Sequence, residues 1–211
     1  MTQTKIGPRD VLIVIDVQND FCKGGLLEVP NGDAVVSPIN QAMKCFSNVI
    51  GTQDWHPTEH DSFASSHQGK SPYDTIELFY GVQTLWPDHC IQGSDGAKFH
   101  KKLDTTRFNM IIRKGLRRGI DSYSAFFEND RVTDTGLSGY LQSRNLRRVF
   151  LCGLAGDICV YYSALDSLSQ GFATFFLEDA CRDVDTADSK AISRESMSKK
   201  GIKILNTKDL T

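Results

Sequence analysis

The sequence predicts an α/β fold with a doubly wound, mostly parallel six-stranded sheet flanked by helices. Short apolar runs alternate along the chain with amphipathic helical segments, which is typical of βαβ units. No internal repeat or low-complexity segment interrupts this alternation. The length of 211 residues suits one domain, 1–211, that is long enough to bury a single large core.

The first elements are indicated by periodicity. Val11–Val17 is almost entirely aliphatic, so we expect a buried central strand that is followed by a functional loop. Asp33–Ser47 carries apolar residues at spacings of three, four and three, which predicts an amphipathic helix. Asn48–Thr52 is a second strand, ending next to Asp54. Pro57–Leu103 is irregular and long, and such loops are usually functional or disordered. Two histidines close to tryptophans, one just before the segment and one inside it, favour function.

The second half of the chain repeats the pattern. Strands are expected over Met110–Arg113, Arg148–Gly153, Phe172–Leu177 and Ile202–Leu205, and helices over Gly136–Asn145, Asp157–Gln170 and Thr186–Lys199. Ligands of such sheets bind outside the carboxyl ends of the strands. Asp16, Asp54, Lys114 and the turn 154–159 all follow predicted strands, so we expect them at one edge.

The net charge, the hydropathy and the cysteine spacing argue against several classes of protein. The net charge of −2 implies no basic face, so nucleic acid is not an expected partner. The longest apolar run, Val11–Ile15, is too short to span a bilayer, and the first residues lack the apolar stretch of a secretory signal. Six widely spaced cysteines form no Cys-x-x-Cys pair, which indicates reduced thiols. We therefore expect a cytoplasmic protein with no membrane contact.

Cys159 is the candidate nucleophile. It lies where a predicted strand turns into a helix, in the stretch Gly153–Cys159. Free N–H groups and the helix dipole in a first turn favour a thiolate, and the same N–H groups could hold an oxyanion. A buried cysteine that packs on the sheet remains the alternative.

Asp16 and Lys114 are candidate partners of this thiol. Each follows an aliphatic strand, where a charged side chain is costly unless it is paired or lines a cleft. Asp16 could accept the thiol proton if burial raises its pKa, and Lys114 could stabilise both anions. The alternatives are a turn aspartate and a solvated lysine beside Arg117 and Arg118.

Asp54, His56 and His89 are candidate metal ligands. Alternate residues at a strand end point the same way, so Asp54 and His56 could reach one ion. Two nitrogens and one oxygen suit Zn²⁺, Fe²⁺ or Mn²⁺. His60 and His67 compete as ligands on sequence alone. We interpret Cys90 as a core residue and His100 as an ordinary surface histidine.

Aromatic residues fall in the loops that face the cleft. Phe21, Trp86 and Tyr123 could stack on a planar substrate, or they could simply pack the long loop onto the sheet. For Trp55 we favour packing, because its neighbours Asp54 and His56 would face the metal.

Five stretches in order resemble the isochorismatase-like cysteine hydrolases, in particular the metal-dependent nicotinamidase and pyrazinamidase branch. They are Ile15–Phe21, Thr52–Pro57, Leu85–Cys90, Arg113–Gly115 and Gly153–Val160. The resemblance implies the fold of that family. It also implies a catalytic triad of Asp16, Lys114 and Cys159, and the metal ligands Asp54, His56 and His89.

The resemblance extends to the surroundings of the thiol. It implies a cis peptide bond between Leu154 and Ala155, and an oxyanion hole formed by the N–H groups of Ala155 and Cys159. Phe21 and Trp86 match substrate-binding residues, and Tyr123 matches a pocket wall. Ser62 stands where some relatives place a further histidine or glutamate ligand, so it would act through water.

The implied activity is hydrolysis of nicotinamide to nicotinate and ammonia in NAD salvage, through a Cys159 thioester. Pyrazinamide is a second expected substrate. The expected metal is zinc, with iron or manganese as the alternatives. Whether the protein forms a homo-oligomer stays open. A different hydrolase of the superfamily would act on isochorismate or an N-carbamoyl amide; isochorismate cleavage needs neither thiol nor metal. A non-catalytic ligand-binding relative and a redox protein with a structural metal stay open as two further classes.

Overall fold

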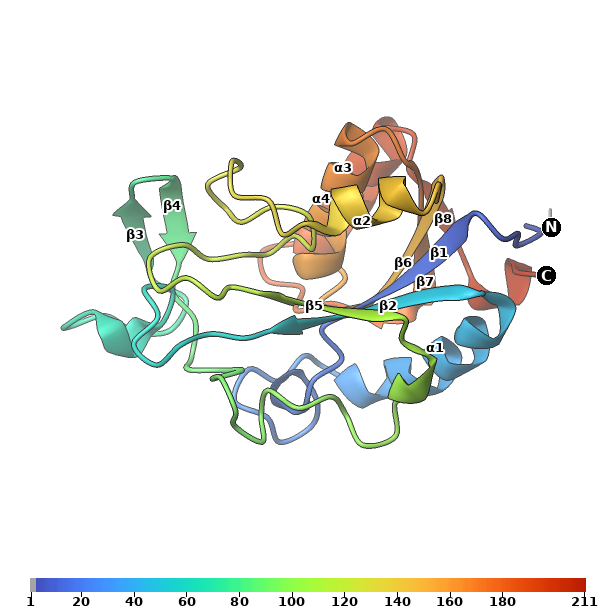
Figure 1. Ribbon diagram of the computed structural model, residues 1–211. Helices are drawn as coiled ribbons and strands as arrows, with labels where there is room; N and C mark the ends of the chain where they lie inside the picture. The colour runs from blue at the N-terminus through green and yellow to red at the C-terminus, as the bar shows by residue number, and fades with distance from the viewer. Residues whose placement is uncertain (1–2) are drawn as a thin grey trace.

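A six-stranded parallel sheet forms the centre of the computed structural model, which describes residues 3–211 (Figure 1). Its strands are β1 (Asp10–Ile15), β2 (Asn48–Asp54), β5 (Met110–Lys114), β6 (Arg148–Leu154), β7 (Ala173–Arg182) and β8 (Lys203–Leu205). The spatial order is β5-β2-β1-β6-β7-β8, and all five pairings are parallel. The chain therefore starts in the middle, winds to one edge and then to the other, as predicted. The switch point lies between β1 and β6.

Helices cover both faces of this sheet. In Figure 1, α1 (Val36–Ala42) lies on one side, and α2 (Leu137–Ser143), α3 (Cys159–Ser169) and α4 (Ser189–Lys199) lie on the other. The helix predicted over Asp33–Ser47 is wrong as one α-helix, because 3₁₀ turns at Gly32–Val35 and Met43–Cys45 flank a shorter α1. Pro38 lacks the N–H group that an α-helix reaching further back would need.

Several strands run further toward the carboxyl edge than the sequence predicts. β2 and β5 include Asp54 and Lys114, which are paired in register. β7 continues to Arg182, because its pairing with β6 resumes after an irregularity between Leu151 and Gly153. Conversely, α3 begins only at Cys159. Asp54 and Lys114 are thus held by sheet backbone rather than by loops.

The segment 57–103 is not wholly irregular. It contains an antiparallel hairpin of β3 (Thr75–Leu78) and β4 (Gly81–Thr84), which projects from the body at the end of the carboxyl edge (Figure 1). Both strands are short and Gln83 is their only buried residue, so they lack the buried apolar run that marks the central strands. The segment returns to the sheet edge through bridges that pair His56 with Ile91 and Phe63 with Trp86.

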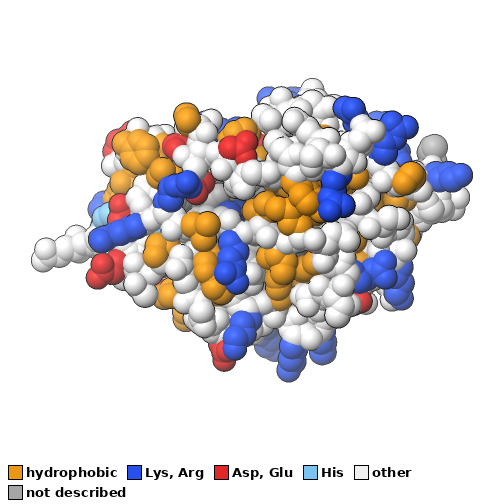
Figure 2. All heavy atoms as spheres, viewed as in Figure 1, with side chains coloured by type: hydrophobic (Ala, Val, Ile, Leu, Met, Phe, Trp, Pro, Cys, Tyr) orange, Lys and Arg blue, Asp and Glu red, His pale blue; other side chains and the backbone are white. Residues whose placement is uncertain are grey.

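The core lies between the sheet and its helices. All six residues of β1 are buried, and the rings of Phe150 and Phe175 stack with centroids 4.3 Å apart. Figure 2 shows hydrophobic side chains gathered over the middle of one face, beside lysines and arginines. Ile111 on the edge strand β5 is 46% exposed. No helix within residues 3–211 combines the length and apolarity needed to cross a membrane.

Candidate active site

Four buried polar side chains meet at the carboxyl edge of the central strands. Asp16 follows β1, Asp54 ends β2, Lys114 ends β5, and Cys159 begins α3 after the turn 155–158 that follows β6. Each is at most 7% exposed. All four were expected at this edge from the sequence, and the structure brings them together.

Lys114 connects the four groups. Its Nζ lies 2.8 Å from Asp16 Oδ2 and 3.7 Å from Cys159 Sγ, and it donates hydrogen bonds to Asp54 Oδ1 and to the Ser122 carbonyl. Burial alone would lower the pKa of this ammonium, but the two carboxylates outweigh burial and raise it well above its usual value. Lys114 is therefore a buried, permanent cation and not a solvated surface lysine.

Asp16 is placed to accept a proton. Thr52 Oγ1 donates a 2.6 Å hydrogen bond to its Oδ1, whereas Oδ2 faces Lys114 and accepts no well-aligned hydrogen bond from residues 3–211. A carboxylate oxygen of Asp16 lies within 4.8 Å of Cys159 Sγ. Burial raises the pKa of Asp16 to about 6, and Lys114 is the group that chiefly opposes the rise.

Cys159 does not have the thiolate character that its helical position suggests. Burial raises the pKa of its thiol well above the usual value, and Lys114 offsets only part of this rise. The carboxylates of Asp54 and Asp16 raise it further. The resting group is accordingly a thiol, and its proton has to leave when the sulfur attacks. The peptide bond between Leu154 and Ala155, just before this turn, is cis.

Asp54, His56 and His89 form the second half of the site. One ligand atom from each lies within 4.8 Å of the others, and both imidazole Nε2 atoms are 3.8 Å from Asp54 Oδ2. Although burial would raise it, the pKa of Asp54 is held well below its usual value by Lys114 and the two imidazoles. The carboxylate is therefore ionised and faces both rings.

The tautomers of the two histidines fit a metal. Nδ1 of His56 lies 3.1 Å from the Gly115 carbonyl, and Nδ1 of His89 lies 2.7 Å from the Pro87 carbonyl. A carbonyl can only accept, so each Nδ1 carries the hydrogen and each Nε2 offers a lone pair. Two lone pairs and one carboxylate oxygen converge on the same space. That donor set suits a divalent ion of the zinc class.

The competing histidines are engaged elsewhere. The His60 ring lies 4.4 Å from that of His56, but its Nδ1 bonds to Ser62 Oγ at 2.7 Å and its Nε2 faces the Ile120 carbonyl. His67 Nε2 donates to the Asp61 carbonyl. The Ser62 hydroxyl is hydrogen-bonded to His60. Its predicted role at the metal, through a bound water, therefore stays a prediction.

A narrow pocket opens above Cys159. Phe21, Trp86 and Tyr123 contribute its aromatic wall, as the sequence predicts. The lining also includes residues that were not predicted from the sequence: Leu27, Val29, Asp121, Ile158 and Val184. Leu27, Val29 and Val184 come from loops whose apolar residues carry no periodic signal. Trp55 is absent from this lining and packs under the Arg113 guanidinium, so its interpretation as a packing residue is confirmed.

Residues 10–209 match the family model described as Isochorismatase domain. The chain belongs to the isochorismatase family. A curated relative of this family, the nicotinamidase of Acinetobacter baylyi, is 46% identical over 199 residues, which cover 94% of this chain and 93% of the relative. Both chains are therefore similar over nearly their whole length.

Solved structures of the isochorismatase family agree with the fold. A nicotinamidase and pyrazinamidase of Acinetobacter baumannii is 47% identical with a TM-score of 0.95, and the match covers 96% of this chain and 98% of that one. The pyrazinamidase of Pyrococcus horikoshii in complex with zinc is 32% identical with a TM-score of 0.77, covering 94% and 99%.

Proposed function

We propose that this protein is a nicotinamidase that hydrolyses nicotinamide to nicotinate and ammonia, and that it also accepts pyrazinamide. One observation carries the proposal: Lys114 touches Asp16, Asp54 and Cys159 at once. It therefore joins a thiol and its proton acceptor to a set of metal ligands. The similarity to nicotinamidases over nearly the whole chain supports the same substrate.

Asp54, His56 and His89 would hold one divalent metal ion, with zinc the first candidate and iron or manganese the others. When bound, the ion supplies a Lewis acid for the ring nitrogen of the substrate. The convergence of two Nε2 atoms on Asp54 Oδ2 supports this assignment. The zinc complex of the similar pyrazinamidase also supports it.

Phe21, Trp86 and Tyr123 would hold the planar ring. The Phe21 ring lies 5.5 Å from that of His89, so a ring bound at the metal site would contact it. Trp86 Nε1 and Gln83 Nε2 both donate to the Tyr123 hydroxyl oxygen, at 3.2 and 3.1 Å. Because its lone pairs are occupied, the hydroxyl keeps its own hydrogen to donate to a substrate.

Cys159 would act as the nucleophile and Asp16 as the proton carrier. As Sγ attacks the carboxamide carbon, the thiol proton passes to Asp16, which then gives it to the departing ammonia. A water molecule next attacks the thioester and transfers a proton to Asp16, and Asp16 returns it to the sulfur. Lys114 holds Asp16 in place. A pKa of about 6 for Asp16 suits a group that both takes and gives a proton near neutrality.

The N–H groups of Ala155 and Cys159 would stabilise the oxyanion. Within residues 3–211 neither group donates a hydrogen bond, whereas the Ala155 carbonyl accepts from the N–H groups of Ile158 and Val160. The Cys159 amide begins α3, the Ala155 amide lies in the turn between β6 and α3, and both residues line the pocket. Fixed donors of this kind lower the energy of a tetrahedral intermediate without reorganisation.

Replacing the thiol tests the nucleophile. Cys159→Ala should lower the kcat of ammonia release from nicotinamide by at least about 10³-fold, while calorimetric binding of nicotinamide is largely kept. Cys45→Ala, which alters an exposed thiol far from the site, is the matched control and should behave like the unaltered protein. A kcat for Cys159→Ala equal to that of the control would refute the mechanism.

Removing the metal tests the second half of the site. Chelation should chiefly raise the KM for nicotinamide, because the ion orients the ring and not the carbonyl, and added Zn²⁺, Fe²⁺ or Mn²⁺ should restore it. Asp54→Asn should show the same defect without restoration. An unchanged kcat/KM in a sample verified to be metal-free would contradict this role.

We also propose a cytoplasmic, single-domain enzyme over residues 1–211 that acts in NAD salvage. All six cysteines are free thiols, which suits a reducing compartment. Nicotinate is a pyridine acid, the kind of precursor from which pyridine nucleotides are built.

A further inference from the structure

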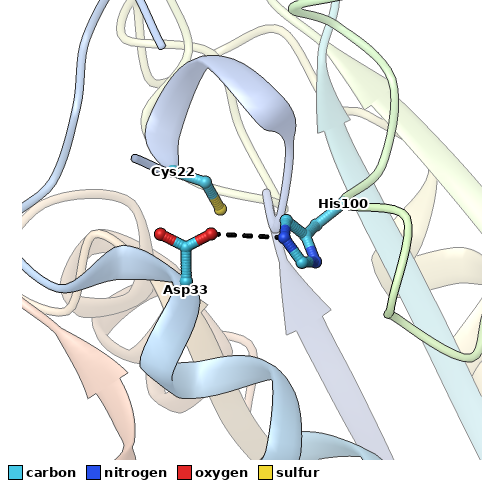
Figure 3. A group of neighbouring side chains, drawn as sticks. All are labelled: Cys22, Asp33 and His100. Atoms are coloured by element: carbon cyan, nitrogen blue, oxygen red, sulfur yellow. Dashed lines mark ion pairs between the residues drawn. The ribbon is translucent and has the colours of Figure 1, made fainter. Parts of the chain in front are cut away.

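A group of three side chains of the types that ligate metals lies outside the active site. Cys22, Asp33 and His100, here called the Cys22 cluster, come from three segments: the loop after β1, the 3₁₀ turn Gly32–Val35, and the stretch before β5 (Figure 3). From the sequence, His100 was expected to be an ordinary surface histidine. Its side chain is in fact only 12% exposed and pairs with Asp33.

The geometry of the Cys22 cluster suits a small ion. One ligand atom from each residue lies within 4.8 Å of the others, and His100 Nε2 is 3.2 Å from Asp33 Oδ1. Ligands of a tetrahedral zinc ion are separated by roughly 3.3–3.8 Å, as follows from bonds of about 2.0–2.3 Å. The three side chains could reach this spacing through small movements.

The sulfur of Cys22 faces the other two side chains of the cluster. Cys22 is 2% exposed, and its Sγ makes no hydrogen bond with residues 3–211. Figure 3 shows it directed into the space between the Asp33 carboxylate and the His100 ring. A surface hollow of about 600 Å³, lined by all three residues, gives that space access to solvent. An ion therefore has an entry path, and water has room beside it.

We propose that Cys22, Asp33 and His100 bind one divalent cation of the zinc class, with water from the hollow completing its coordination. Sulfur, imidazole and carboxylate ligands together favour zinc over magnesium or calcium, which prefer oxygen ligands alone. The site is separate from the set of Asp54, His56 and His89. It shares none of those side chains.

Binding would change the protonation of two ligands. Burial raises the pKa of the Cys22 thiol to about 12, and the carboxylates of Asp33 and Glu28 add to the rise, so the ion displaces the thiol proton. In the resting state His100 Nδ1 accepts from the Lys102 N–H at 3.3 Å. The imidazole hydrogen then moves from Nε2 to Nδ1, and that long contact is lost. One proton is released for each ion bound.

The bound ion would hold in place a loop that forms part of the substrate pocket. Cys22 directly follows Phe21, which lines that pocket and contacts His89. Coordination of one ion by both Cys22 and His100 would tie this loop to the stretch before β5. The site is therefore structural, since none of its ligands lines the pocket above Cys159.

Metal stoichiometry of the full chain tests the proposal. After chelation and dialysis against Co²⁺, the unaltered protein should bind one equivalent more than Cys22→Ser or His100→Gln. Cys45→Ser, with an exposed thiol outside the cluster, should match the unaltered protein. A sulfur-to-cobalt charge-transfer band should be present in the unaltered protein, in Cys45→Ser and in Asp54→Asn, and absent in Cys22→Ser. Equal stoichiometry in all variants, or a band that survives in Cys22→Ser, would overturn the site.

A measurement on the unaltered protein covers the case in which Cys22→Ser fails to fold. Native protein is alkylated with iodoacetamide, with and without Zn²⁺, and the modified cysteines are identified by peptide mass spectrometry. Zn²⁺ should slow the modification of Cys22 at least tenfold and leave that of Cys45 unchanged. Equal rates at Cys22 in both samples would refute the proposal.

Discussion

Lys114→Met is the substitution that tests most directly how the buried charges depend on one another. Methionine keeps most of the side-chain volume and removes the ammonium that lies between Asp16 and Asp54. Lys114 is 1% exposed, so both carboxylates would stay buried without a cation. Breaking a buried ion pair in this way costs about 3–5 kcal/mol of unfolding free energy.

Lys114→Met should also prevent Asp16 from carrying the proton. Burial raises the pKa of Asp16 to about 6 against the opposing effect of Lys114, so losing the cation raises it further. A higher folded-state pKa leaves a larger fraction of Asp16 protonated at pH 7, and the protonated form cannot take the thiol proton. We therefore expect kcat for ammonia release to fall by roughly 10²–10⁴-fold.

Urea unfolding in the presence of chelator and the ammonia assay measure the two effects. The double variant Asp16→Asn/Lys114→Met separates the effect on stability from the effect on activity. It removes one of the two carboxylates that Lys114→Met leaves buried without a cation. Its stability loss should be at least about 1 kcal/mol smaller than the sum of the losses in the two single variants, whereas its activity should stay as low. Wild-type stability of Lys114→Met, or strictly additive losses, would refute this account of the charge network.

Two further predictions concern positions beside the site. In Gly115→Ala the new Cβ would clash with the His56 ring, so the zinc affinity measured by equilibrium dialysis should fall about 10–100-fold. The control is Gly81→Ala, which is also at positive φ but has nothing within 4 Å of the new Cβ, and it should bind zinc normally. Equal zinc affinities in the two variants would contradict the prediction. Asp157→Ala should lower the unfolding free energy by about 2–4 kcal/mol, because the buried carboxylate accepts hydrogen bonds from Val184 N, Asp185 N and Ser189 Oγ. Asp157→Asn should lose less stability by urea unfolding, because its amide oxygen can still accept part of these hydrogen bonds. Equal losses in the two variants would contradict this account.

Local patterns were sufficient for the parallel sheet and its polar edge. A run of aliphatic residues predicts each central strand, and a charged residue immediately after such a run must lie at the carboxyl end of that strand. This reasoning places Asp16, Asp54 and Lys114 at one edge without any knowledge of strand order. It misses the β3–β4 hairpin, because strands that bury little apolar surface have no such run.

The sequence by itself therefore determined which chemistry this protein carries, through residue types at strand ends and the five motifs of its family. The tertiary structure added the geometry of the candidate metal set, which the family resemblance had named without distances. The path of segment 57–103, held by the His56–Ile91 and Phe63–Trp86 bridges, brings His89 to Asp54 and turns His60 toward Ser62. Tertiary burial also decided that Cys159 rests as a thiol, and long-range contacts assembled the Cys22 cluster. The reason is physical: periodicity depends on near neighbours, whereas burial and ligand geometry depend on segments far apart in the chain.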